Sequence, residues 1–380
     1  MSKIEIPLII DKIAKLQHTA DRRYFPEGVL PSYRENAFLF YRRPDTNIFF
    51  TAITVFTLNQ IKQYLPEKSQ KQIGEISEKA IRNYPLFQNK DGLKTYNFFR
   101  TKPSRHFPNG YLFKHFEHFR IPDDIDDTAF IYLTSAHSKE DAEWLQQKLI
   151  LHSNNYRRTI NNTFPHYKSL KAYSTWFGKN MYIEFDACVM SNMLYCQLSD
   201  QLVLDEHGKD CLRYIQSVIL KDEYLKQPFR VAHQYPKTSL IIYHVTRLME
   251  AFPLPELEIC RNKIVEDTLF LLRNESLHLM DKLLLETSLL RLNALKKPEI
   301  IHILEQKTAP VSGKPELSNE LFKGFYFFIA GFLTAYENPV LYKLASSRIA
   351  HFTWQCEAHN WTLVSEYLQY CSLLSASQKT

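Results

Sequence analysis

Six short segments that are apolar on nearly every side recur along the chain, and they most constrain how it can fold. They are residues 51–56, 127–132, 186–190, 238–243, 286–290 and 328–333. A surface helix carries a polar face, whereas a helix that is hydrophobic all round has to be buried. The sequence therefore predicts a set of interior helices.

The spacing of these segments predicts how the interior helices are connected. They follow one another at intervals of roughly 45 to 75 residues, the length of a helical hairpin with its loops. Segments with a charged face lie between them, such as residues 140–149 and 209–215, and we expect these to form outer helices. Six hairpins close a ring, so we predict an all-α fold, a single (α/α)6 barrel over residues 31–375, preceded by an N-terminal helix and loop in residues 1–30.

Composition narrows the function classes. Only 9 of 380 residues are glycine, which disfavours a hairpin-rich β fold or a phosphate-binding glycine loop. The net charge of +6 comes without a nucleic-acid-binding motif, so we expect no nucleic-acid partner. The six cysteines lie within apolar patterns, as expected of buried free thiols, and no apolar run is long enough to span a bilayer. We therefore expect a cytoplasmic protein that is not transmembrane.

An unusual run of aspartates opens the second apolar segment. Asp123, Asp124, Asp126 and Asp127 fall within five residues and are followed by Thr128 and Ala129. Like charges a few ångströms apart in a buried place cannot all stay ionised, so at least one carboxyl should keep its proton near neutral pH. The alternative is that the aspartates only cap a helix, because acidic residues are common in a first turn.

Residues 124–129 resemble the Asp-x-Asp-Asp-Thr-Ala motif of class II terpene cyclases. The resemblance implies an α/α-toroid fold and an enzyme that protonates a prenyl or polyprenyl substrate, with Asp126 as the proton donor and Asp124 and Asp127 as its flanking partners. Asp123 extends the same cluster. The chain departs from this family in having length for one barrel only, and it lacks the Gln-Trp repeats of the triterpene branch.

Other residues are candidates for binding such a substrate. Arg100, Lys102 and Arg105 alternate with aromatic residues before the aspartate run and are suited to holding a diphosphate. The alternative is a solvated basic loop. Trp176, Tyr235 and Tyr243 are candidates for lining the cavity, although aromatic residues at helical spacing also serve as core.

Three further interpretations remain open. Asp123 to Asp127 also fits the Asp-Asp-x-x-Asp pattern that holds Mg²⁺ against a diphosphate, but no second metal motif accompanies it. Asp186 and Cys188, with His244 as a third ligand, resemble the zinc site of protein prenyltransferases, which are single barrels. A non-catalytic toroid that binds an apolar ligand or a protein, and a sugar-processing barrel using Asp126 and Asp186, are the remaining alternatives. We expect no cofactor in the leading interpretation, an isoprenoid substrate, and room for a protein partner or a homodimer.

Overall fold

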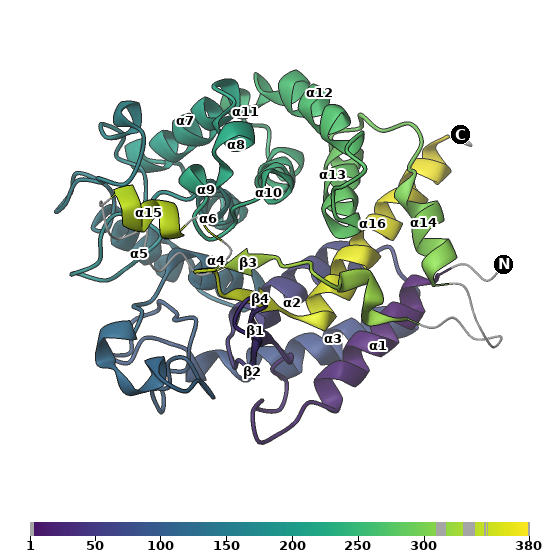
Figure 1. Ribbon diagram of the computed structural model, residues 1–380, viewed down its shortest axis with the longest axis horizontal. Coiled ribbons are helices and arrows are strands. Elements are labelled where there is room, and N and C mark those ends of the chain that lie inside the picture. The colour runs from purple at the N-terminus through teal and green to yellow at the C-terminus, as the bar shows by residue number, and fades with distance from the viewer. Residues whose placement is uncertain (1–3, 309–316, 330–338, 346, 348, 379–380) are drawn as a thin grey trace.

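Helices make up most of the described chain. The computed structural model describes residues 4–308, 317–329, 339–345, 347 and 349–378. Six buried helices form its centre (Figure 1): α2 (Phe49–Lys62), α4 (Ile125–Thr134), α6 (Ala187–Ser199), α10 (Thr238–Ala251), α13 (Leu279–Arg291) and α16 (Glu357–Ser377). Each packs against the next one along the chain, and α16 packs against α2, so the contacts close on themselves. We refer to these six as the central helices.

A second set of helices covers the central ones. It comprises α1 (Ile6–His18), α3 (Glu67–Ile81), α5 (Lys139–Ile150), α7 (Glu206–Leu220), α12 (Arg261–Leu272) and α14 (Ile300–Lys307). Among these, α3 packs on α2, α7 on α6, α12 and α14 on α13, and α1 on both α16 and α3. The expected N-terminal helix is therefore packed directly against the central helices. Four short α-helices and several 3-10 turns are also present among the described residues; the short α-helices are α8 (Glu223–Lys226), α9 (Pro228–Val231), α11 (Pro255–Glu258) and α15 (Pro339–Ala345).

The two sets of helices differ in residue pattern. In α2 every residue from Phe49 to Leu58 is buried. The hydroxyl of Thr57 donates a 2.9 Å hydrogen bond to the backbone carbonyl of Ile53. This local bond lets a threonine sit in an apolar environment without an unpaired hydroxyl. By contrast, α7 buries one face, which includes Asp210, and exposes the charged residues Glu206, Lys209 and Arg213 on the other. The pattern of burial thus separates interior from covering helices.

Acidic and hydroxyl residues begin several helices. Asp186 starts α6 by accepting hydrogen bonds from the backbone N–H groups of Cys188 and Val189, at 2.9 and 3.2 Å. Ser138 and Asp141 form a reciprocal capping box at the start of α5. The first N–H groups of a helix have no partner within it, and these side chains supply one.

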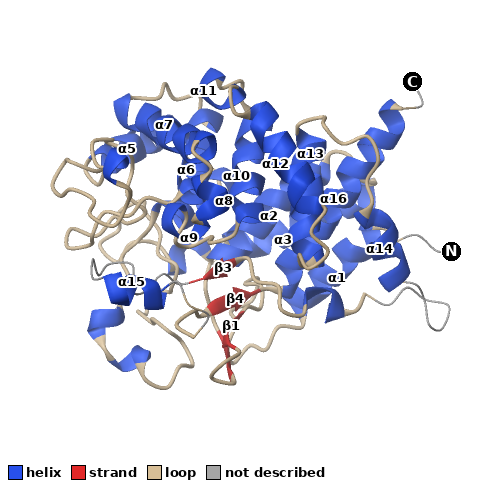
Figure 2. Ribbon diagram, turned by 45° about the horizontal axis from the view of Figure 1, so that its top comes forward, coloured by secondary structure: helices blue, strands red, loops and turns tan. Residues whose placement is uncertain are grey.

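A small antiparallel sheet lies beside the helices (Figure 2), and the sequence patterns did not predict it. Its strand order is β2 (Tyr41–Pro44), β1 (Tyr33–Asn36), β4 (Thr353–Gln355) and β3 (Phe328–Ile329). The prediction of a sixth interior helix at 328–333 is therefore wrong for residues 328 and 329, because Phe328 pairs with Trp354 in the sheet. Residues 330–333 lie outside the described residues. The sixth central helix is α16. A run of six apolar residues does not by itself distinguish a strand from a helix.

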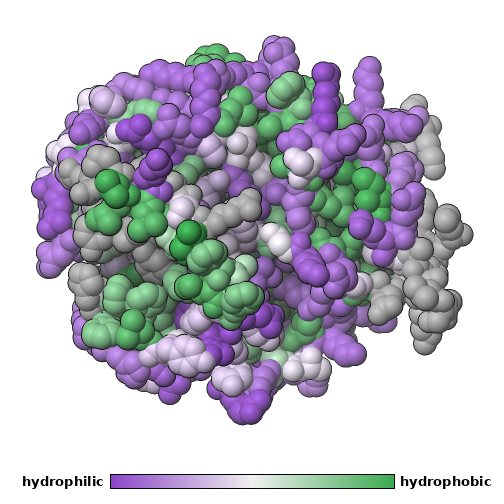
Figure 3. Space-filling view, viewed as in Figure 1, coloured by the Kyte–Doolittle hydropathy of each residue, from purple (hydrophilic) through white to green (hydrophobic). Residues whose placement is uncertain are grey.

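Part of the surface is apolar. On the face seen in Figure 3, hydrophobic side chains gather over α15 and around the sheet. The tip of the β1–β2 hairpin exposes Phe38, Leu39 and Phe40, and Phe40 is 97% exposed. Within the described ranges, every helix is too short or too polar to cross a bilayer.

Candidate functional site

The aspartate run forms the first turn of central helix α4. Asp124 is its N-cap, and one carboxylate oxygen accepts hydrogen bonds from the backbone N–H groups of Asp126 and Asp127, at 3.0 and 2.8 Å. The capping interpretation is thus correct for Asp124. It leaves the side chains of Asp126 and Asp127 without a capping role, although both are buried.

Asp126 points into a polar network between the central helices. Its Oδ1 accepts a hydrogen bond of 2.7 Å from the side-chain amide of Asn192 on α6, and its Oδ2 accepts one from the hydroxyl of Tyr235, which precedes α10. The side chain is 6% exposed. One carboxyl therefore joins three parts of the chain that are far apart in sequence.

The network continues to two basic residues of α10. The Asn192 Oδ1 accepts a hydrogen bond of 2.5 Å from Arg247 and lies 2.8 Å from Nδ1 of His244. Arg247 is buried, and its guanidinium lies 5.1 Å from the ring centre of Phe56. The buried cation of Arg247 is thus linked to Asp126 through the side chain of Asn192.

Burial changes the acidity of these groups. It raises the pKa of Asp126 to about 6, although the hydrogen bonds from Tyr235 and Asn192 and the charge of Arg247 act in the opposite direction. Burial likewise raises the pKa of Asp124 to about 7. Burial and the neighbouring Asp124 raise the pKa of Asp127 well above its ordinary value.

Asp123 has a different role from the other three aspartates. Its Oδ2 accepts hydrogen bonds from Asn89 at 2.5 Å and from Thr95 at 2.6 Å, and its Oδ1 lies 3.4 Å from the amide of Asn97. These partners belong to the preceding loop. Asp123 therefore anchors that loop and is not part of the Asp126 network.

Aromatic rings surround Tyr235. The ring centres of Phe327, Phe328 and Phe49 lie 5.9, 6.0 and 6.2 Å from that of Tyr235. Phe327 also packs against His359 of α16, with 4.6 Å between ring centres. The surroundings of Asp126 are thus aromatic on the side of Tyr235.

Two buried histidines beside Phe327 have unpaired nitrogens. Nε2 of His244 and Nε2 of His359 have no hydrogen-bond partner among the described residues. Burial lowers the pKa of His244 well below its ordinary value and that of His359 to about 3, so both rings are neutral at pH 7. A neutral imidazole nitrogen of this kind can accept or donate one hydrogen bond, depending on its tautomer.

The expected cavity-lining residues divide into two groups. Tyr235 contacts Asp126 directly. Tyr243 donates a 2.7 Å hydrogen bond to Glu366, while its ring lies 6.3 Å from that of Phe327 and 5.5 Å from the guanidinium of Arg247. Trp176 is half-buried, and its backbone pairs with that of Asp124 in an isolated bridge.

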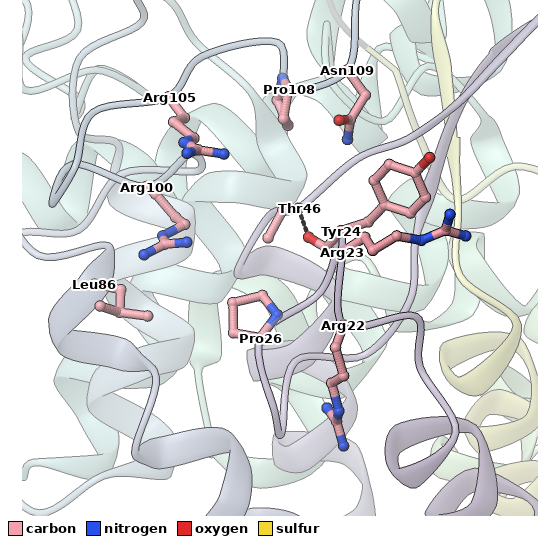
Figure 4. Close-up of a pocket in the computed structure, with 10 residues that line it drawn as sticks. All are labelled: Arg22, Arg23, Tyr24, Pro26, Thr46, Leu86, Arg100, Arg105, Pro108 and Asn109. Atoms are coloured by element: carbon pink, nitrogen blue, oxygen red, sulfur yellow. Dashed lines mark hydrogen bonds between the residues drawn. The ribbon is translucent and has the colours of Figure 1, made fainter.

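The basic candidates lie elsewhere. Arg100 and Arg105 line a pocket to which no central helix contributes (Figure 4), whereas Lys102 is exposed and does not line it. The structure therefore does not join these three residues into one site with Asp126.

The zinc alternative has no support in the geometry. Both carboxylate oxygens of Asp186 accept backbone hydrogen bonds, one of them at 2.9 Å from the N–H of Gln234. Across the part of the chain that the structure describes, no three His, Cys, Asp or Glu side chains come together as a metal site, so Asp186, Cys188 and His244 do not form one. For the same reason, the aspartates from Asp123 to Asp127 do not form a Mg²⁺ site by themselves within the described residues.

Comparisons with known proteins found no match to this chain. No family model, curated protein or solved structure matches this chain. The network around Asp126 therefore has to be interpreted from its own chemistry.

Two members of the network were not among the residues expected from sequence. Asn192 and Arg247 are buried polar residues of the largely apolar central helices α6 and α10. Such residues are seldom buried without a specific partner, and this was the available signal. His244 and Arg247 are three residues apart on α10, which places them on one face of the helix.

Proposed function

We propose that the chain is a terpenoid-cyclase-like enzyme in which Asp126 protonates a prenyl or polyprenyl substrate inside a single (α/α)6 toroid. The cyclic packing of the six central helices, with covering helices outside, supports the architecture. The observation that carries the function is Asp126 itself, a buried carboxyl whose pKa of about 6 lies close to neutrality, beside a set of aromatic rings. A general acid works best when its pKa is near the working pH.

The surroundings suit the chemistry of alkene protonation. The proton leaves Asp126 as a C–H bond forms to one alkene carbon, and the other carbon becomes a carbocation. The carboxylate that remains is stabilised by the hydrogen bonds from Tyr235 and Asn192 and by the charge of Arg247. Aromatic faces such as that of Phe327 stabilise the cation by cation–π attraction.

The neighbouring histidines do not compete for the proton. Because the pKa of His359 is about 3, its ring is a far weaker base than the carboxylate of Asp126. Burial and the charge of Arg247 also lower the pKa of His244 well below its ordinary value. At a pH near or below 6, where Asp126 carries its proton, neither histidine takes that proton from it.

A non-catalytic toroid is the second candidate. One observation favours it: Phe327 packs against Tyr235, His244 and His359, and so fills space next to Asp126. In that case the interior binds an apolar ligand, or the chain binds a protein, without turnover.

Product analysis tests the proposal. Purified protein is incubated with prenyl diphosphates and polyprenes, and the extracts are analysed by gas chromatography and mass spectrometry. We expect a cyclised product whose rate falls at least about a hundredfold in Asp126→Asn, the lower range for general acid catalysis. The rate should also fall as the pH rises above about 6, since the acid form is then lost.

Asp123→Asn is the matched control. It makes the same change three residues away, at a carboxyl bound by Asn89 and Thr95. This variant should keep its turnover as long as its melting temperature is preserved. Unchanged turnover in Asp126→Asn contradicts the proposed mechanism, and ligand binding without any product favours the non-catalytic toroid.

A further inference from the structure

A pocket of about 260 Å³ lies between two loops, away from the Asp126 network. One wall is formed by Arg22, Arg23, Tyr24 and Pro26, and the other by residues of the segment 100–109, with Thr46 and Leu86 between them (Figure 4). None of the lining residues belongs to a central helix. The pocket is therefore a separate feature.

The charge of this pocket is uncompensated. Four arginines line it and no acidic residue does. Arg23 is paired with Asp21 at 2.6 Å, but Arg22, Arg100 and Arg105 have no carboxylate partner within the described residues. The guanidinium of Arg22 donates a 3.1 Å hydrogen bond to the backbone carbonyl of His18 and points away from Arg100 and Arg105 in Figure 4, so two positive charges share the space on their side of the pocket.

The two arginines of the 100–109 segment lie close to each other. Figure 4 shows the side chains of Arg100 and Arg105 on the same side of the pocket, opposite Pro26 and Tyr24. The Nε of Arg100 is buried and has no hydrogen-bond partner. Burial and the nearby charge of Arg105 both lower the pKa of Arg100, which reflects the mutual repulsion of the two cations. An anion between them relieves this repulsion and supplies the missing acceptor.

We propose that this pocket binds the phosphate or diphosphate group of a small molecule. Guanidinium groups bind phosphate oxygens through paired, charge-assisted hydrogen bonds. Two adjacent cations without a carboxylate partner suit a multiply charged anion better than a single carboxylate. The volume of about 260 Å³ compares with about 30 Å³ for one water molecule in the liquid, so it accommodates a diphosphate. This inference does not depend on the chemistry proposed for Asp126.

Titration calorimetry with inorganic pyrophosphate tests the site at fixed ionic strength, since salt screens such contacts. We expect saturable binding by the 380-residue chain and a loss of at least about tenfold in affinity in Arg105→Gln, the range for one charge-assisted contact. Arg105 is exposed, so this variant should remain folded, and Arg100→Gln provides a second measurement.

Lys102→Gln is the matched control. It removes the same charge from the same segment, but Lys102 does not line the pocket. Its affinity for pyrophosphate should stay within about twofold of the original. Absence of binding, or an equal loss in Lys102→Gln and Arg105→Gln, overturns the proposal, because the second result shows a diffuse charge effect.

A further arm distinguishes the source of the phosphate group. Farnesyl diphosphate is titrated alongside pyrophosphate, and Asp126→Asn should bind pyrophosphate as the original chain does. Tighter binding of farnesyl diphosphate, lost together in Arg105→Gln, supports the pocket as a site for the headgroup of a prenyl substrate. Equal affinities support a site for a free phosphorylated metabolite.

Discussion

Replacing Asp126 with asparagine should make the stability of the protein less dependent on pH. Burial raises the pKa of this carboxyl from the ordinary 3.8 to about 6 in the folded chain. The folded state therefore binds the proton more tightly than the unfolded state does. It follows that the original protein loses stability as the pH rises from about 4 through 6, because the unfolded chain releases the proton first.

The size of this effect follows from the shift. A tenfold change in proton affinity corresponds to about 1.4 kcal/mol, so the rise of the pKa from 3.8 to about 6 destabilises the charged folded form by about 3 kcal/mol. About half of that loss falls between pH 5 and pH 8. Asp126→Asn removes the titrating group, so its stability relative to the original chain should rise by on the order of 1 kcal/mol over this interval.

Urea denaturation at pH 5, 6, 7 and 8, followed by tryptophan fluorescence, measures this difference. Tyr235→Phe is a companion variant that should make the stability more dependent on pH, the opposite of the effect of Asp126→Asn. It removes a hydrogen bond that lowers the pKa of Asp126, so the pH dependence should become steeper and extend to higher pH. A constant stability difference between Asp126→Asn and the original chain from pH 5 to 8 would refute the raised pKa and, with it, the argument for a general acid.

Two further variants test other buried polar groups. Glu366→Gln should lower the free energy of unfolding by about 3 kcal/mol, because Glu366 accepts a 2.5 Å hydrogen bond from the buried Arg291 and a 2.7 Å one from Tyr243. Chemical denaturation measures this loss, and a value below about 1 kcal/mol contradicts the prediction. Asp124→Ala should cost about 1 kcal/mol through loss of the α4 cap, whereas Asp124→Ser, which retains an acceptor without the charge, should keep most of the stability; equal melting temperatures for the two variants argue against the capping role.

Much of the helical arrangement could be predicted from the sequence. Five of the six apolar segments fall in central helices α2, α4, α6, α10 and α13, because burial on all sides leaves a strong hydrophobic signal. The sixth central helix, α16, gives a weaker signal since it buries Glu366, His359 and Asn360 among its apolar residues. Its place in the centre depends on ion pairs and hydrogen bonds with distant residues, which a local pattern does not contain.

The sheet was missed for a related reason. Its strands are two to four residues long, and β1 joins segments more than 300 residues apart in sequence by pairing with β4. Arg34 of β1 is fully buried and forms an ion pair with Asp45. A charged residue in a short polar strand gives no hydrophobic periodicity, so only the three-dimensional pairing reveals its role.

The candidate site shows the same limit at the level of single side chains. Four aspartates that are nearly adjacent in sequence acquire three different environments: Asp123 is bound by its preceding loop, Asp124 caps α4 and interacts with Asp127, and Asp126 alone reaches Asn192 and Tyr235. The motif singles out Asp126, although all four carboxyls are buried. Burial raises the pKa of Asp126, whereas Tyr235, 109 residues away, and the buried charge of Arg247 on α10 both lower it. A sequence motif can thus nominate an acid, but the strength of that acid is a property of the packed helices around it.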